Sequence, residues 1–261
     1  MFCSRSALLA ICFTASLTAT ILSLSCTSTR QLSSSSPDMV LKRFLSHRLP
    51  SSYASRLKLW INLRTSQKGR TELQVYSKHS QEYSFFLKDL WGKDLMRALI
   101  WNDSILVFYP HDNQFIRETL ANFSQSDYWF WPVSPLDLLK IIDGTQFLAL
   151  KETDFSGFAD KLYKYRAKRE ETSIVLSLSP KDAALREAIL LNEKREELVH
   201  IIWQDVRLYK GYYRPRLIDI KLENSGDEIK IGVLEETFDS NLADRYFRLS
   251  LPPSATQILL Y

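Results

Sequence analysis

The chain has 261 residues, of which 45% are apolar and 25% charged, and its formal net charge is +4. This composition is typical of a globular protein, so it excludes a chain that is disordered throughout and a membrane protein with many spans. The charge is also too small for a dedicated nucleic-acid binder, which carries a strongly basic domain or stripe, and we expect no nucleic-acid partner.

The first 25 residues have the pattern of an export signal. Arg5 supplies a positive charge, the stretch that follows it to Ser25 is uncharged and largely apolar, and a polar Ser/Thr-rich tract comes next. Cys26 directly follows this stretch, and the other two cysteines, Cys3 and Cys12, precede it. Cleavage before Cys26 leaves one thiol at the new N-terminus, which is typical of a lipidation site rather than of a disulfide scaffold. A plain cleaved signal and an uncleaved anchor are the alternatives.

Three parts of the chain follow from this pattern. We expect a signal peptide at residues 1–25, then a lipidated Cys26 with a flexible Ser-rich tether up to residue 37, and one domain over residues 38–261. The first element after the tether is a helix from about Pro37 to Leu49. Ser36 is its predicted N-cap, and Pro50 helps to end it.

Short strands dominate the next stretch. Residues 56–64 alternate apolar and polar side chains with a period of two, which predicts a strand with one buried face. The apolar side chains of that face are Leu57, Leu59, Ile61 and Leu63. The turns between this strand and its successors are short, so we predict an antiparallel meander rather than βαβ units. The further strands are expected at residues 71–77, 82–87, 95–101, 104–109 and 114–117.

A capping box begins a second helix. Ser134-Pro135-Leu136-Asp137 has a capping residue, then proline at the first helical position, and Gly144 stands where a C-terminal glycine is expected. Residues 179–205 fit either a helix or a hairpin. The β-forming residues of the second arm favour a hairpin of residues 185–191 with 196–203. The remaining strands of this region are expected at residues 145–151, 160–168 and 172–179.

The C-terminal part also alternates. Residues 216–222 and 228–234 predict a hairpin, with the isoleucines Ile218, Ile220, Ile229 and Ile231 recurring at every second position, and residues 246–251 predict a last strand. Together these elements predict a mainly β domain of about ten strands with some helices, which belongs to the α+β class. A long antiparallel sheet tends to curl, and helices that cover its concave face would enclose an apolar cavity suited to acyl chains.

No motif indicates catalysis. The four histidines, His47, His79, His111 and His200, have no zinc-binding spacing, and there is no nucleophile elbow, dinucleotide fingerprint or phosphate-binding loop. Adjacent acidic pairs such as Glu196-Glu197 face opposite sides of a strand. We expect no enzyme, no metal and no cofactor, although a triad assembled from distant residues would leave no local pattern.

Two clusters of aromatic residues remain. The run Tyr128, Trp129, Phe130 and Trp131 precedes the second helix. It either packs in a corner of the core or forms a lid, a ligand contact or a membrane contact. Residues 207–216 interleave aromatic and basic side chains. They form either a solvated hairpin or a contact with anionic lipid headgroups.

The order and spacing of these elements resemble the lipoprotein-localisation family, with its periplasmic carrier and its outer-membrane insertion receptor (LolA/LolB-like). One part of the resemblance lies in residues 98–144, where Leu99-Ile100-Trp101 precedes Asn102-Asp103, the strand at residues 104–109 and the helix that ends at Gly144. The other lies in residues 213–253, which contain Tyr213-Arg214-Pro215 and end at Pro252-Pro253.

This resemblance implies an open, strongly curved antiparallel sheet, a half-barrel, wrapped around a helical lid with an apolar cavity between them. It implies binding of lipoprotein acyl chains without catalytic residues, and a protruding apolar loop in the membrane-bound receptor. Residue 27 is threonine and not the aspartate that retains such proteins in the inner membrane, so we expect lipid anchoring in the bacterial outer membrane, facing the periplasm. We expect a monomer.

The expected function is therefore a non-enzymatic carrier or insertion factor that binds lipid or lipoprotein acyl chains. Burial of acyl methylenes at about 0.8 kcal/mol each would supply the affinity. The expected ligand-binding side chains are Leu57, Leu59, Ile61, Leu63, Ile218, Ile220, Ile229 and Ile231. The alternative is a structural or interaction lipoprotein of the envelope, with the same fold and a filled core.

Overall fold

The computed structural model describes residues 35–47, 50–64, 68–78, 82–129, 133–144, 153–169 and 172–260. The chain divides into two compact units, and Ser36–Tyr261 is the second. The predicted signal peptide and Cys26 lie outside the described residues, and so does the strand predicted at residues 145–151. The predicted division of residues 1–37 into signal and tether stays a prediction.

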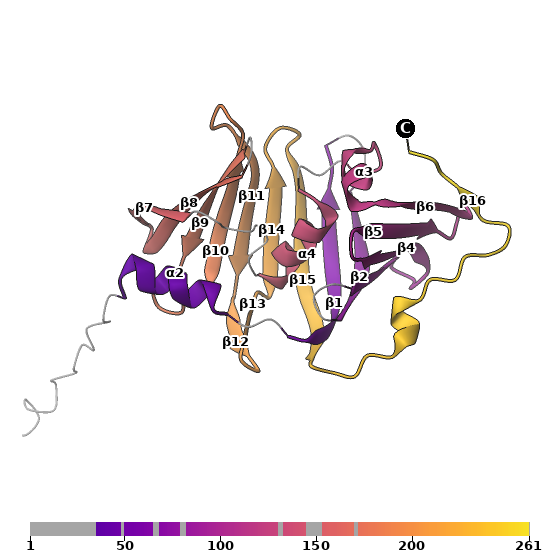
Figure 1. The fold of residues 1–261 in the computed structure, drawn as a ribbon, viewed down its shortest axis with the longest axis horizontal. Coiled ribbons are helices and arrows are strands. Elements are labelled where there is room, and N and C mark those ends of the chain that lie inside the picture. The colour runs from indigo at the N-terminus through magenta and orange to yellow at the C-terminus, as the bar shows by residue number, and fades with distance from the viewer. Residues whose placement is uncertain are drawn as a thin grey trace, which may run out of the picture. The chain divides into compact units, whose positions relative to one another are not determined.

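One open sheet forms most of this second unit. Its 14 strands follow the order β16-β6-β5-β4-β3-β2-β1-β15-β14-β11-β10-β9-β8-β7, and the end strands β16 and β7 are not paired with each other. Every neighbouring pair is antiparallel except β16 with β6. Figure 1 shows β4, β5 and β6 running across the direction of β14 and β15, so the sheet is strongly twisted.

The first half of the sheet is a meander that precedes the helices α3 and α4. Its strands are β1 (Ser52–Asn62), β2 (Lys68–Lys78), β3 (Glu82–Lys88), β4 (Asp94–Trp101), β5 (Ser104–Tyr109) and β6 (Gln114–Thr119). The second half consists of β7 (Thr153–Ala159), β8 (Leu162–Arg169), β9 (Thr172–Leu178), β10 (Leu185–Leu191), β11 (Glu197–Gln204), β14 (Leu217–Leu222) and β15 (Asp227–Phe238). The hairpin of β12 (Arg207–Tyr209) and β13 (Tyr212–Arg214) stands apart from the sheet, and β16 (Thr256–Gln257) completes it.

The two halves join at the pair of β1 and β15. Tyr53 lies opposite Phe238, and Asn62 lies opposite Glu228, so the first strand of the chain pairs with the last long one. Along β1, buried residues alternate with partly exposed ones, so one face of this strand lies against the core.

Three α-helices are described. They are α2 (Pro37–Leu45), α3 (Leu120–Gln125) and α4 (Pro135–Asp143), and Ser36, Thr119 and Ser134 cap their N-termini. In Figure 1, α4 lies across the face of β14 and β15, and α2 lies beside β9 and β10. We call α4 the lid. The core is one cluster that contains the inner faces of the strands together with the lid residues Leu139, Ile141 and Ile142.

Most of the predicted elements are confirmed. The hairpin of residues 185–191 with 196–203 exists as β10 and β11, the segment 207–216 contains a hairpin, and the helix after Ser134 ends at a left-handed Gly144. The count of about ten strands was too low, since sixteen are described. The sheet, its openness and its helical lid match the predicted α+β architecture.

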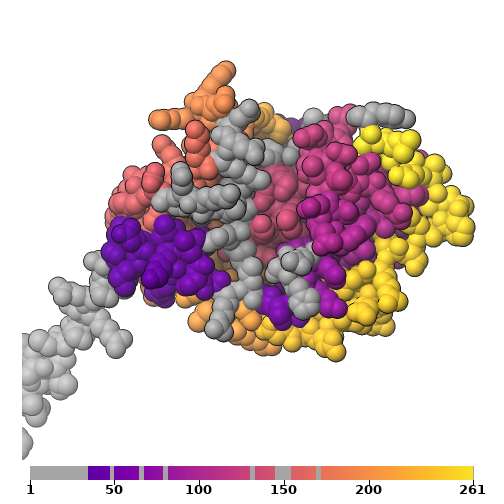
Figure 2. Space-filling model, viewed as in Figure 1, coloured from indigo at the N-terminus to yellow at the C-terminus, as the bar shows by residue number. Residues whose placement is uncertain are grey.

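Two elements differ from their predictions. The first helix ends at Leu45 rather than Leu49. The Ser46 hydroxyl donates a hydrogen bond to the Arg43 carbonyl and so caps the helix end. The ring of His47 then packs 4.5 Å from the ring of Tyr213. The strand predicted at residues 246–251 is wrong. Residues Asp244–Phe247 form a 3-10 helix, whose Tyr246 ring stacks on Tyr76 at 4.2 Å. Figure 2 shows the yellow C-terminal segment lying against the magenta residues of the first meander.

Candidate functional site

The inner face of the three central strands brings the predicted ligand-binding side chains together. The pairing register places Leu59, Ile231 and Ile218 in one row across β1, β15 and β14. It places Ile61, Ile229 and Ile220 in the next row. Leu57 lies on the same face of β1, whereas Leu63 lies just beyond the end of that strand. An apolar surface therefore forms where the two meanders join.

The lid shares its core cluster with these rows. Leu57 and Ile218 have 0% exposure and Ile220 has 2%, and the lid residues Leu139 and Ile141 belong to the same buried cluster. Ile61, Ile229 and Leu63 are partly exposed. The face is thus covered at its centre and reaches solvent at one end. A ligand on the central part of this face requires the lid to move.

The C-terminal end of the lid contacts two residues of the second half of the chain, Trp203 and Pro215. Trp203 on β11 donates from its indole Nε1 to the carbonyl of Ile141 at 2.8 Å. Gly144 follows the lid with a φ of +65°, and a Cβ added there would lie 2.9 Å from Cδ of Pro215. The close approach of Pro215 to a left-handed backbone explains why glycine ends this helix.

A buried ion cluster provides a further attachment of the lid. Arg214 donates from Nη1 to both the carbonyl and Oδ1 of Asp143, at 3.0 and 3.1 Å, and from Nη2 to Oε1 of Glu236 at 2.7 Å. The side chains of Arg214 and Glu236 are 3% and 2% exposed. The Arg214 guanidinium also lies over the rings of Tyr53 and Phe238, 5.3 and 5.4 Å from their centres.

Burial controls the electrostatics of this cluster. It raises the pKa of Asp143, although the guanidinium of Arg214 opposes that shift, and the negative charge of Glu236 adds to it. Burial would lower the pKa of Arg214, but the two neighbouring carboxylates raise it above its usual value. The cluster therefore holds a permanent cation between two carboxylates, at a point that connects the lid, β13 and β15.

An apolar tip protrudes at the turn between β3 and β4. Leu90 is 65% exposed and Trp91 is 89% exposed. The turn is fixed by Asp89, whose Oδ1 accepts from the backbone N–H groups of Trp91 and Lys93 at 2.9 Å each, and Gly92 adopts a φ of +83°. Two large apolar side chains are therefore held in solvent by a defined turn.

A groove lies between this tip and the apolar face. Its volume is about 600 Å³, and it is open to solvent. Its lining residues are Trp60, Ile61, Asn62, Lys68, Gly69, Arg70, Asp89, Leu90 and Trp91. Ile61 belongs both to the groove and to the row that contains Ile229, so the groove connects the exposed tip with the partly exposed end of the apolar face. Three basic residues, Lys68, Arg70 and Lys93, are exposed around it.

Sequence analysis missed Leu90 and Trp91. The available signal was a pair of large apolar residues in the turn Asp89-Leu90-Trp91-Gly92 between two lysines, where polar residues are usual. The predicted aromatic cluster of residues 128–131 does not act as one exposed surface among the residues that the structure describes. Tyr128 is 46% exposed, whereas Trp129 donates from Nε1 to the carbonyl of Val133 and packs on Phe123. Phe130 and Trp131 lie outside the described residues.

The described residues offer neither a metal site nor a membrane-spanning helix. In the described ranges there is no group of three or more His, Cys, Asp or Glu side chains that could hold a metal ion. The same residues contain no helix that is long and apolar enough to cross a membrane.

Comparison with solved structures identifies the fold. A LolA superfamily protein from Nitrosomonas europaea superposes with a TM-score of 0.60 at 16% identity, over 81% of this chain and 97% of that one. A DUF1329 family protein from Desulfovibrio piger gives 0.62 at 13% identity, over 80% and 94%. A domain designated an outer membrane lipoprotein-sorting protein, from Vibrio parahaemolyticus, gives 0.57 at 10% identity, over 80% and 94%. The protein has a LolA-like fold, an open antiparallel sheet with a helical lid.

Comparison by sequence adds no relative. No family model matches the chain, and no curated protein matches it significantly.

Proposed function

We propose that the protein is a lipid-anchored carrier or insertion factor that receives acyl chains of lipids or lipoproteins and delivers them to a membrane. The observation that carries this proposal is the groove that links the exposed Leu90–Trp91 tip to the apolar face under the lid. Tryptophan and leucine favour the boundary between headgroups and acyl chains, and exposed basic residues beside them favour anionic headgroups. The LolA-like fold supports the same function.

The rest of the proposal concerns place and ligand. Lipidation of Cys26 would hold the domain at the periplasmic side of the bacterial outer membrane. The ligand would lie on the face formed by Leu57, Leu59, Ile61, Ile218, Ile220, Ile229 and Ile231, with Leu63 at its open end. The protein would act as a monomer and without a chemical step. The groove gives an acyl chain a path to this face that begins at Ile61.

A second candidate function has its own support. Leu57 and Ile218 have no exposed surface, as in a filled core, and a filled core suits a structural or interaction lipoprotein of the envelope. The two candidates differ in whether the lid opens for a ligand.

Bound lipid distinguishes the two candidates. Residues 36–261, which form a compact unit, are purified without detergent and extracted with organic solvent for mass spectrometry. We expect lipid in stoichiometric amount. Replacing the partly exposed Ile61 or Ile229 with glutamate should lower the lipid content. The control Ile202→Glu changes a side chain of β11 that is 38% exposed, and it should leave the lipid content unchanged. A lipid-free extract from folded protein would favour the second candidate.

The tip is tested by transfer to vesicles. The variant Leu90→Ser/Trp91→Ser should transfer a fluorescent diacylated peptide to anionic vesicles at least about tenfold more slowly, because each lost apolar contact is worth roughly 1.5–3 kcal/mol. Phe158→Ser removes a side chain that is 60% exposed at the far end of β7 and serves as the matched control. Equal rates for both variants and the wild type would contradict a role for the tip.

A further inference from the structure

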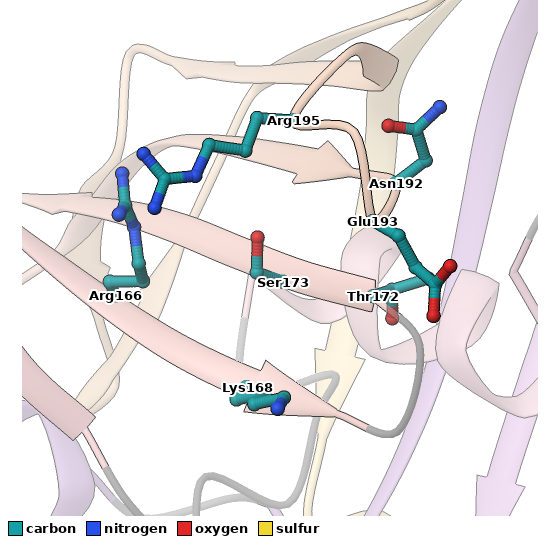
Figure 3. Close-up of a pocket in the computed structure, with 7 residues that line it drawn as sticks. All are labelled: Arg166, Lys168, Thr172, Ser173, Asn192, Glu193 and Arg195. Atoms are coloured by element: carbon teal, nitrogen blue, oxygen red, sulfur yellow. The ribbon is translucent and has the colours of Figure 1, made fainter.

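A polar hollow lies between β8, the start of β9 and the turn that joins β10 to β11. Its volume is about 380 Å³, and Figure 3 shows its lining. The lining residues are Arg166, Lys168, Thr172, Ser173, Asn192, Glu193 and Arg195. None of them belongs to the apolar face or the groove, so the proposed function leaves this hollow without a role.

Strand pairing builds the hollow on the outer side of the sheet. Arg166 and Lys168 alternate along β8 with Tyr165 and Ala167, which are buried in the core, so the two basic side chains point away from it. Lys168 lies opposite Ser173 on β9. Ser173 in turn lies opposite Leu191, the last residue of β10. The turn that follows β10 is thereby brought over the basic residues of β8.

The third basic residue of the hollow, Arg195, lies in the tight turn between β10 and β11. The Asn192 side chain accepts from the N–H of Glu196 at 2.9 Å and donates to its carboxylate at 2.7 Å. Arg195 adopts a φ of +63°, and its N–H donates to the carbonyl of Asn192 at 3.0 Å. Figure 3 shows the guanidinium groups of Arg195 and Arg166 on the same side of the hollow and turned toward each other.

The three exposed basic side chains line one hollow, and such a concentration of positive charge attracts anions. In the described part of the chain, Arg166, Lys168 and Arg195 make no ion pair, whereas other basic side chains, such as Arg186 on β10, do. Two arginines can bind the oxygens of one phosphate in bidentate fashion, and a lysine adds a point charge. In Figure 3 the Ser173 side chain lies between the two guanidinium groups on one side and Thr172 and Glu193 on the other.

Glu193 gives the hollow a second side. Its carboxylate lies beside Thr172, across the hollow from the two guanidinium groups. A carboxylate there disfavours a second anionic group and favours a donor such as an ammonium or hydroxyl group. We infer that the hollow binds a phosphate ester whose other substituent carries a hydrogen-bond donor, as in a phosphoethanolamine group. Such a group occurs both in lipid headgroups and in soluble compounds.

Calorimetric titration tests the site. Residues 36–261 should bind O-phosphoethanolamine with one-to-one saturation and bind inorganic phosphate more weakly. Arg166→Gln/Arg195→Gln should weaken both at least about tenfold, because it removes the two bidentate partners. The matched control Arg117→Gln/Arg248→Gln removes the same charge from exposed positions outside the hollow and should bind as the wild type does. Loss of equal size in both double variants, or no saturable binding, would overturn the inference.

A single variant tests the second side of the hollow. Glu193→Gln should abolish the preference for O-phosphoethanolamine over inorganic phosphate. An unchanged preference would refute the role of Glu193. Melting temperatures of all variants establish that they are folded.

Vesicles distinguish the two sources of the ligand. Binding to phosphatidylethanolamine vesicles that depends on Arg166 and Arg195, with Leu90 and Trp91 replaced by serine to remove the tip, would identify a lipid headgroup. If the protein binds O-phosphoethanolamine but its binding to these vesicles does not depend on Arg166 and Arg195, the ligand is a soluble phosphate ester. Because the tip is absent from this measurement, its outcome is independent of the proposed function.

Discussion

The guanidinium of Arg214 neutralises two carboxylates, those of Asp143 and Glu236, where solvent does not reach. Replacing it with methionine leaves both carboxylates buried without a cation, so Arg214→Met should lower the free energy of unfolding by about 3–5 kcal/mol. Without the guanidinium that opposes the effect of burial, the pKa of Asp143 rises further in the folded state. Folded protein binds more protons than unfolded protein, so the loss should shrink as the pH falls.

Urea denaturation at neutral and at acidic pH checks this expectation. The control is Arg207→Met. Its ion pair with Asp205 has side chains that are 66% and 49% exposed, so this variant should lose far less stability than Arg214→Met. Losses of similar size for the two arginines would show that the buried cluster does not stabilise the fold.

His47 gives the stability a pH dependence. Burial and the charge of Arg43 lower the pKa of His47, and the charge of Asp182 opposes them. Below the ordinary value of about 6.5, the unfolded chain binds a proton that the folded protein does not, so the stability that depends on neutral His47 is lost as the pH falls. His47→Phe keeps the ring beside Tyr213 and should lose less stability between about pH 7.5 and 5.5. Parallel denaturation profiles for the two proteins would refute this assignment.

Residues with a local pattern could be predicted, and residues defined by distant partners could not. The alternation of Leu57 and Leu59 along one strand indicated a buried face, and that burial is observed. Arg214 was grouped with the basic residues of 207–216, because the carboxylates that bury it come from Asp143 and Glu236, which are remote in the sequence. Leu90 has no periodicity, and its exposure depends on how the turn at Asp89 is fixed.

Gly144 determines how the lid ends at the sheet. Gly144→Ala adds a Cβ 2.9 Å from Pro215 at a φ of +65°, so it should lower the free energy of unfolding by about 1–3 kcal/mol. Gly69→Ala is the matched control, because no atom lies within 4 Å of its added Cβ. Thermal or urea denaturation measures the difference. If both alanine variants lose the same stability, the contact with Pro215 does not hold the lid.

At the scale of whole elements, apolar runs and turns in the sequence predicted the bounds of some strands correctly. Strand β5 (Ser104–Tyr109) and strand β10 (Leu185–Leu191) have the predicted bounds. Strand β5 is a short apolar run, and β10 contains four leucine and isoleucine residues beside Arg186 and Glu187. The segment 246–251 also looks like a strand, but its aromatic residue Tyr246 stacks on Tyr76 and the chain continues to pair at β16 instead. Local propensity does not include that tertiary contact.

The C-terminal segment covers one open edge of the sheet. Thr256 donates its N–H to the carbonyl of Asn113, and Ile258 donates to the carbonyl of Phe115, so β16 pairs with β6. A chain that lacks residues 254–261 would expose this edge of β6 to other chains, and we expect it to self-associate. Light scattering after size-exclusion chromatography measures the mass. Leu259→Ser, which changes a 58%-exposed side chain and leaves the strand in place, should stay monomeric. A monomeric truncated protein would show that β6 needs no cover.

The pairing of β1 with β15 has a consequence for the order in which the chain can fold. Residue 53 must find residue 238, so the centre of the sheet is closed by contacts that span most of the chain. Contacts of this range make folding slow, since much chain entropy is lost before they form. If the chain is threaded through a membrane pore from its N-terminus, β1 waits with one neighbour until nearly the whole length has emerged. In that case the last step of folding waits until translocation is almost complete, and one edge of β1 stays unpaired and open to a chaperone in the meantime.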